Sequence, residues 1–494
     1  MENQDLDPRN QEIVDNRELN IWEALIPILA LVGMLAYNVF VFGDEALSGS
    51  NQFILLLGAA VAAIVGFFNK TSFDVMMEEV AQNIKSTAGA ILILLMVGAL
   101  AGTWLISGII PTMIYYGLQI LNPSIFLAAC VIICAIISVA TGSSWTTSAT
   151  VGIALIGIAN ALGISLGMTA GAILSGAYFG DKLSPLSDTT NLAPAMAGTD
   201  LFTHIQYMLY TTVPTITITL IVFIIIGLNI ETTGEADTSS ILASIDDAFT
   251  ITPWLFIVPA LVIFLIIKKT SPLVALLIGT LLGGIAALIV QPELVAGLGG
   301  SESLTFKSGY MGIMNAITVD TAIETTNENL NDLFAASGMA GMLGTIWLIL
   351  CAMTFGGIMD AIGALSRISK FMLNLFKSTF GLFASTSVTC VVLNATASDQ
   401  YLAIVVPGKM YAKAFKDKGL APENLSRTLE DSGTVTSVLV PWNTCGAYQS
   451  GVLGVSAADY FVYAIFNWLS PFMTLLFAAF RIKIRTLAEA RTSK

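Results

Sequence analysis

The stretch GDKLSPLSDTTN, residues 180–191, places two carboxylates, a lysine and a proline within a long apolar region. Because proline lacks a backbone N–H and interrupts a helix, this stretch predicts a break near Pro185. A carboxylate at the centre of a bilayer costs about 2.5–3.5 kcal/mol on insertion scales, so such residues usually have a partner and a function. Residues 430–444 combine EDSGT with PWNT and predict a second break. Together the two stretches predict a helical membrane protein whose helices are interrupted at membrane depth.

The composition supports an all-α polytopic membrane protein. Of the 494 residues, 55% are hydrophobic and 11% charged, against roughly 25% charged in soluble domains, and the mean hydropathy is +0.81. The apolar blocks have the length of membrane-spanning helices, about 18–25 residues. These features exclude soluble, collagenous and disordered chains, and unbroken apolar blocks exclude a β-barrel. The net charge of −13 argues against nucleic-acid binding, and the five cysteines are expected to be buried apolar residues.

Apolar blocks and interruptions follow one another in an order that occurs twice. Uninterrupted spans are predicted over residues 21–43, 51–69, 87–107, 202–230, 251–268, 271–291, 338–360 and 457–481. Re-entrant hairpins are predicted over 124–164 and 381–408, and broken helices over 167–198 and 424–455. Matching positions keep their spacing, since 34 residues separate Ser107 from Thr141 and 34 separate Asp360 from Asn394. We therefore predict two repeats, residues 21–230 and 251–481, with about ten transmembrane helices and two re-entrant hairpins.

Charges in the connecting segments predict the orientation, because Lys and Arg stay on the cytoplasmic side. Residues 231–250 hold five acidic side chains and no Lys or Arg, so this linker is predicted to be extracytoplasmic. Counting spans from it gives the repeats opposite orientations and places both tails, residues 1–20 and 482–494, in the cytoplasm. Inverted repeats with broken helices are a known architecture of secondary transporters. The chain is therefore expected to be a multi-pass protein of the plasma (inner) membrane.

Oxygen-bearing side chains in the interrupted regions form the candidate site. Carbonyls freed at helix breaks coordinate small cations, and burial favours the protonated form of a carboxyl group, so one carboxylate can hold either Na⁺ or H⁺. The carboxylates expected to bind the ion or the proton are Asp181, Asp188, Asp399 and Asp431. The expected Na⁺ ligands are Asp188, Asn191, Asn394 and Asn443, with backbone carbonyls. Further substrate contacts are expected from the three asparagines and from Lys182, Thr147, Ser148, Ser187, Thr189, Thr396, Ser398 and Thr444.

Some of these residues also have structural interpretations. Asp181 could pair with the adjacent Lys182 and only stabilise the break, whereas Asp188 has no neighbouring cation in the sequence. Asn443 and Thr444 could cap a half-helix instead of binding an ion.

Four other polar residues are equally open to two interpretations. Glu430 and Asp431 follow Arg427 by one helical turn and could form an ion pair with it at the cytoplasmic mouth. Asp360 could line the cavity or simply end a helix. The sole histidine, His204, follows a possible Asp200 helix cap near the cytoplasmic surface; it could sense protons there, but an ordinary interfacial residue is favoured.

The motifs that the chain lacks also restrict its function. It has no Walker A sequence, no His/Cys metal cluster and no nucleophile elbow. A gradient-driven transporter without a cofactor is therefore favoured over an ATP-driven pump or an enzyme. Two opposed hairpins also argue against a channel. The leading hypothesis is exchange of Na⁺ for H⁺, and the alternative couples Na⁺ or H⁺ to a small organic anion, for which Lys182 is the one cation at bilayer depth.

The stretch from Gly180 to Pro194 strongly resembles the signature of the NhaC-type sodium/proton antiporters, a family of the ion transporter superfamily that includes malate/lactate antiporters. Residues 141–150, 394–409 and 439–446 are also similar to that family, and the resemblance covers roughly 20–480. It implies a homodimer in the lipid bilayer with an elevator fold, in which a transport domain of hairpins and broken helices moves against a scaffold. It also implies Na⁺ and H⁺ as substrates and no cofactor.

Overall fold

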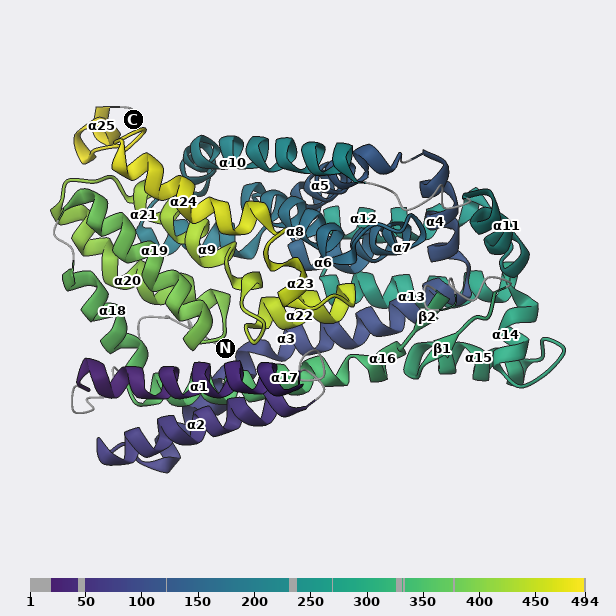
Figure 1. Cartoon of the computed structure of the whole chain (residues 1–494), viewed down its shortest axis with the longest axis horizontal. Helices are drawn as coiled ribbons and strands as arrows, with labels where there is room; N and C mark the ends of the chain where they lie inside the picture. The colour runs from purple at the N-terminus through teal and green to yellow at the C-terminus, as the bar shows by residue number, and fades with distance from the viewer. Residues whose placement is uncertain are drawn as a thin grey trace, which may run out of the picture.

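The computed structural model describes residues 19–42, 49–120, 122–230, 238–268, 270–325, 331, 334–375 and 378–492, and they are mostly helical (Figure 1). The predicted N-terminal tail therefore lies almost wholly outside the described residues. Up to residue 230 the elements are α1 (Ile21–Phe42), α2 (Ser50–Phe68), α3 (Phe73–Ile106), α4 (Ile109–Ile120), α5 (Pro123–Thr141), α6 (Ser144–Thr147), the π-helix η3 (Ser148–Gly152), α7 (Ile153–Ala161), α8 (Leu166–Leu183), α9 (Asp188–Ala197) and α10 (Leu201–Asn229).

The second part of the chain is similarly divided into long and short helices. Up to residue 361 these are α11 (Thr238–Ala248), the 3₁₀-helix η4 (Pro253–Phe256), α12 (Ile257–Ile267), α13 (Pro272–Val290), α14 (Pro292–Leu298), α15 (Phe306–Thr318), strands β1 (Thr321–Ala322) and β2 (Ala335–Ala336), α16 (Gly338–Gly341) and α17 (Leu343–Ala361). They are followed by α18 (Ala364–Leu375), α19 (Thr379–Thr396), α20 (Gln400–Asp417), α21 (Pro422–Leu429), the π-helix η6 (Glu430–Thr434), the 3₁₀-helix η7 (Ser437–Leu439), α22 (Thr444–Leu453), α23 (Ala457–Phe461), α24 (Ile465–Ala479) and α25 (Leu487–Thr492).

Eight helices in the described ranges are long and apolar enough to cross a membrane, namely α1, α2, α3, α5, α10, α13, the α16–α17 segment and α19. A ninth span results if α11 and Pro253–Ile267, which meet at 85°, are counted together. This is fewer than the ten or so predicted, partly because the last predicted span is interrupted between Phe461 and Ile465, leaving α24 only 15 residues long. The polytopic α-helical fold is confirmed, although the two-residue strands β1 and β2 form a small antiparallel pair.

The helices form two groups that meet along the polar segments (Figure 1). Helices α1, α2, α3 and α17 lie side by side in one group, and α13 packs on α3. In the other group α5 packs along α8 and α10, and α10 also contacts α24. Helix α22 contacts both α17 and η3, so the second broken segment lies where the groups meet.

The first broken segment is held close to helix α5 by glycine. A Cβ atom at Gly176 would lie 2.2 Å from the Val131 carbonyl oxygen, and one at Gly180 would lie 2.5 Å from that of Ala135. Because only glycine permits this approach, the end of α8 lies directly against α5. Helix α8 then ends at Leu183 and α9 begins at Asp188, so the break predicted at Pro185 is confirmed.

The second broken segment changes helix type several times. The π-helix η6 follows α21 directly, and α22 begins only after Pro441, with Asn443 as its N-cap residue. Ahead of it, α19 and α20 flank a tip at Ala397–Asp399, and α20 continues to Asp417, nine residues beyond the predicted end of the hairpin. Backbone groups at both breaks are thereby released from the regular helical ladder.

Candidate functional site

An ion pair between Lys182 and Asp431 connects the two broken segments. Lys182 lies in the last turn of α8 and Asp431 in the π-helix η6, and neither side chain is exposed to solvent. The Lys182 ammonium group donates to Asp431 Oδ1. The interpretation that Lys182 pairs with its neighbour Asp181 is therefore wrong, because the end of α8 points the lysine toward η6.

The other oxygen of Asp431 accepts hydrogen bonds from two threonines of the long helices. Thr211 on α10 donates to Asp431 Oδ2 at 2.9 Å, and Thr474 on α24 donates to the same oxygen. The sequence prediction missed both threonines. The only signal in the sequence is that each lies within three residues of a proline inside a span, Pro214 and Pro471.

Asp181 joins the first hairpin tip to the first broken segment. Its Oδ2 atom accepts hydrogen bonds from the backbone N–H of Ser144 at 3.1 Å and from the Ser144 hydroxyl at 2.7 Å. The Thr190 hydroxyl lies 3.1 Å from the carbonyl oxygens of both Asp181 and Lys182, across the break. Gly142 makes this contact possible, since its φ of +73° turns the chain at the tip.

Asp188 lies on the accessible side of the break. Unlike Asp181, Asp399 and Asp431, it is exposed, at the first position of α9. The Ser187 side chain caps α9 and lies 3.2 Å from the Thr189 hydroxyl. The Asn191 amide group donates to the carbonyl oxygens of Pro185 and Ser187, at 3.0 and 2.7 Å. Polar groups around the break therefore form hydrogen bonds with one another, while the Asp188 side chain remains exposed.

The second hairpin tip is joined to the second broken segment in a similar manner. The Asn394 side-chain amide group donates to the Gly433 carbonyl oxygen at 2.7 Å, and Asn443 donates to that of Asn394 at 2.9 Å. The Thr444 backbone N–H donates to the Ser398 carbonyl oxygen at 2.9 Å. The capping interpretation of Asn443 is confirmed, because its Oδ1 accepts from the first turn of α22.

Asp399 is the N-cap of α20 and accepts a hydrogen bond from the Leu402 N–H at 3.0 Å. Asp181 and Asp399 thus each accept a hydrogen bond from a backbone N–H near a hairpin tip. Asp431 is held differently, by its ion pair with Lys182.

Four of the hydroxyl groups predicted to contact substrate fall into two classes. Thr147 and Thr396 each donate to a carbonyl oxygen of their own helix turn. Ser148 and Ser398 are buried and their hydroxyls have no hydrogen-bond partner among the described residues. Within those ranges no group of three or more His, Cys, Asp or Glu side chains could hold a metal ion. A cation bound here would thus be held by one or two carboxylates completed by hydroxyl and carbonyl oxygens.

The predictions for Arg427 and His204 need correction. Arg427 is fully buried and forms no ion pair with Glu430 or Asp431; its guanidinium group lies over the Tyr207 ring, 4.6 Å from the centroid. His204 is buried rather than interfacial, and its Nδ1 lies 2.8 Å from the Ser426 hydroxyl. Asp200 does cap α10, as expected.

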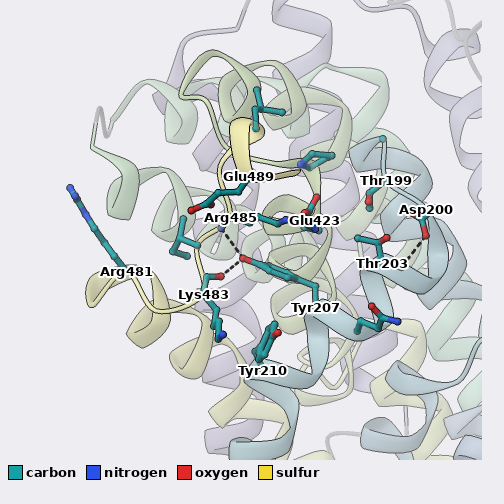
Figure 2. Close-up of a pocket in the computed structure, with 15 residues that line it drawn as sticks. Thr199, Asp200, Thr203, Tyr207, Tyr210, Glu423, Arg481, Lys483, Arg485 and Glu489 are labelled. Atoms are coloured by element: carbon teal, nitrogen blue, oxygen red, sulfur yellow. Dashed lines mark hydrogen bonds and ion pairs between the residues drawn. The ribbon is translucent and has the colours of Figure 1, made fainter. Parts of the chain in front are cut away.

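A cavity of about 1090 Å³ lies at the end of the molecule that carries the C-terminal segment (Figure 2). None of the predicted site residues lines it. Tyr207 stands in its wall, with the hydroxyl directed at the C-terminal segment: the Arg485 N–H donates to it at 3.0 Å, and it donates to the Lys483 carbonyl oxygen. Arg485 in turn pairs with Glu423 at 2.9 Å.

Residues 176–482 match the model of the Na⁺/H⁺ antiporter family. The chain belongs to this family. It is 36% identical over 440 residues to the Na⁺/H⁺ antiporter NhaC of Alkalihalophilus pseudofirmus, covering 88% of this chain and 92% of that one. It is also 36% identical to the malate-2H⁺/Na⁺-lactate antiporter of Bacillus subtilis, covering 92% and 93%. The arginine/ornithine antiporter ArcD of Halobacterium salinarum is 33% identical, with 96% and 94% covered.

This NhaC-type antiporter is thus a multi-pass transporter of the cell membrane and not an enzyme. The matched region begins within α8, ahead of the break at Pro185, and ends just after α24. It therefore contains every carboxylate discussed above and both threonines that bind Asp431.

Proposed function

We propose that the protein exchanges Na⁺ for H⁺ across the membrane through the carboxylates of the two broken segments. The buried Lys182–Asp431 pair, with Asp181 next to it, is the observation that supports this most strongly. Charges at this depth are costly unless they are paired or functional. Asp181 directly precedes Lys182 in the sequence but is not paired with it, which leaves its negative charge for a mobile cation.

Asp188 and Asp181 are the proposed route of the cation. Asp188 is exposed at the break and so meets ions from water, whereas Asp181 is buried seven residues earlier, at the end of α8. The Asp181 carboxylate is stabilised by two donors of Ser144, and in the described ranges no Lys or Arg nitrogen lies within 4 Å of it. A carboxylate stabilised only by neutral donors can accept either Na⁺ or a proton, and one ion displaces the other.

The remaining oxygen ligands are proposed from the two tips. Asn191, Asn394, Asn443 and the free hydroxyls of Ser148 and Ser398 lie on the segments that meet around the breaks. Asp399 and Asp431 complete the set of carboxylates. Asp431 would become available when Lys182 moves away, since both of its oxygens are occupied otherwise.

We also infer that the chain is built from two inverted repeats and works as a homodimeric elevator. In each repeat the hairpin tip bonds to the broken segment that follows it: Ser144 to Asp181 in the first, Asn394 to Gly433 in the second. This parallel supports a common origin of the two halves. Helices α1, α2, α3 and α17 would form the scaffold, and the tips and broken segments the moving part.

Purified protein in proteoliposomes tests the exchange. An imposed Na⁺ gradient should move protons in the opposite direction, reported by a pH-sensitive dye inside the vesicles. Asp188→Asn and Asp181→Asn should abolish this proton movement while the protein remains folded. Asp417→Asn, at an exposed position at the end of α20, is the matched control and should retain it. Unchanged activity of both site variants would overturn the assignment.

A second candidate function is exchange coupled to a carboxylate-bearing solute. Two relatives are named for organic substrates, malate and lactate in one and arginine and ornithine in the other. All four compounds carry a carboxylate. Lys182 is unsuited to bind it because Asp431 occupies the lysine, but Arg427 is a buried cation without an ionic partner in the described part of the chain. Adding malate, lactate or arginine to the proteoliposomes would show whether any of them alters Na⁺-driven proton movement.

A further inference from the structure

Arg427 is a buried cation with no ionic partner among the residues that the structure describes. The side chain is fully buried in α21, between the rings of Tyr207 and Phe477, whose centroids lie 4.6 and 5.8 Å from its central carbon. Its three guanidinium nitrogens have no hydrogen-bond acceptor among the described residues. The aromatic faces attract the cation but accept none of its N–H groups in the plane of the guanidinium.

A guanidinium group carries five N–H donors and stays charged, so burial without an acceptor is costly. Buried arginines are normally paired with carboxylate or phosphate, whose two oxygens match the planar fork of donors. The environment of Arg427 supplies stacking but no such oxygens. A bound group with two anionic oxygens could accept hydrogen bonds from the Arg427 guanidinium group.

No acidic side chain among the described residues forms an ion pair with Arg427. Asp431 uses one oxygen for Lys182 and the other for Thr211 and Thr474. Glu430 is three residues from Arg427, yet no nitrogen of Arg427 lies within 4 Å of it. The rings of Tyr207 and Phe477 lie against the arginine on the side of α21 that faces α10 and α24, and no acid among the described residues forms an ion pair with it.

The cavity at the C-terminal segment provides access for an anion. Tyr207 is shared between Arg427 and this cavity, because its ring carries the guanidinium group. The Tyr207 side chain also lines the cavity (Figure 2). Arg481, Lys483 and Arg485 line the cavity, as do the acids Asp200, Glu423 and Glu489, so the attraction for an anionic group would come from Arg427 itself. One turn before Tyr207, the buried His204 Nε2 atom lacks a partner in the described residues and offers a second polar contact.

We propose that Arg427 binds the carboxylate group of a small organic solute that enters from this cavity and is exchanged by the protein. The inference rests on the second candidate function above and specifies its binding residue. A rotation of Tyr207 away from the guanidinium would expose the fork of donors to the cavity. Lysine could replace the charge of Arg427 but not this fork.

Binding and transport of defined carboxylates test the proposal. Malate and lactate, as N-methylglucamine salts free of Na⁺, should raise the unfolding temperature of the purified wild-type protein, whereas neutral lactamide should not. Arg427→Lys keeps the charge but loses the fork of donors, and should weaken this binding at least ~10-fold, the loss expected for one hydrogen bond between charged groups. It should also abolish counterflow of radiolabelled malate or lactate in proteoliposomes. Lys413→Ala, at an exposed position of α20, should behave as wild type.

Each outcome separates this proposal from the exchange of Na⁺ for H⁺. A wild-type protein that exchanges Na⁺ for H⁺ but ignores malate, lactate and arginine overturns the carboxylate site alone. Wild-type affinity in Arg427→Lys overturns it as well. Absence of Na⁺-driven proton movement in the wild type overturns the proposed exchange and leaves the binding assay valid. If Arg427→Lys does not fold, modification of wild-type Arg427 by phenylglyoxal, mapped by mass spectrometry, must be slowed by malate; equal rates overturn the site.

Discussion

Replacement of Asp431 by asparagine removes one charge of the buried ion pair and keeps the size of the side chain. Asp431 and Lys182 are both fully buried, so Asp431→Asn leaves the ammonium group without a counter-ion and without water. Removing one partner of a buried pair costs about 3–5 kcal/mol. Because the Thr211 and Thr474 hydroxyls also lose a charged acceptor, the free energy of unfolding should fall by an amount near the upper end of this range.

A paired replacement distinguishes lost charge from lost packing. Lys182→Met combined with Asp431→Leu removes both charges, and apolar residues of similar volume often replace a buried pair without loss of stability. Thr211 keeps the Met208 carbonyl oxygen as an acceptor at 3.2 Å, which limits its cost. The double variant should therefore lie within about 2 kcal/mol of wild type and be more stable than Asp431→Asn. It should still lack transport.

Thermal unfolding of the detergent-purified variants, followed by tryptophan fluorescence, measures these differences. Thr211→Val should cost about 1.5–3 kcal/mol, the range for hydrogen bonds to charged groups. Thr219→Val is its matched control on the same helix, because the Thr219 hydroxyl only donates to the Thr215 carbonyl oxygen at 2.8 Å. A wild-type unfolding temperature for Asp431→Asn, or a double variant no more stable than Asp431→Asn, would refute the reasoning.

Three further substitutions test how the tips are held. Gly142→Ala should lower the free energy of unfolding by about 1–3 kcal/mol and impair exchange. A Cβ atom there would lie 2.6 Å from the Leu186 Cβ atom, and the φ of +73° suits glycine. Wild-type yield and exchange would contradict this. Tyr448→Ala removes a ring stacked 4.0 Å from that of Trp145 and should cost about 3–5 kcal/mol in thermal unfolding. Tyr448→Phe keeps the ring and loses only the hydrogen bond to the Trp145 carbonyl oxygen, so it should cost about 1 kcal/mol; equal losses would count against the stacking. Asn443→Ala removes the cap of α22 and should cost about 1–2 kcal/mol, and Asn443→Asp should recover most of that loss if capping is the main role.

Several features of the fold could be predicted because they depend on residues close together in the sequence. A long apolar block is expelled from water whatever its neighbours are, so the first span ends at Phe42 and the third at Ile106, each one residue from its predicted end. Proline acts on its own helix, and the break at Pro185 lies where it was predicted. Helix caps are equally local, and both Asn443 and Asp200 cap the helices that follow them.

The partners of the charged residues were decided only by the tertiary structure. Lys182 pairs with a carboxylate 249 residues away rather than with its neighbour, and Thr211 and Thr474 reach that carboxylate from two other helices. Arg427 lies one turn from two acids and stacks on a tyrosine instead. Hydropathy and helix breaks arise from interactions between residues close in sequence, so each segment determines its own. The partner of a buried charged side chain depends instead on which helices meet and how each is rotated. The packing of the whole helical bundle therefore determines these partners.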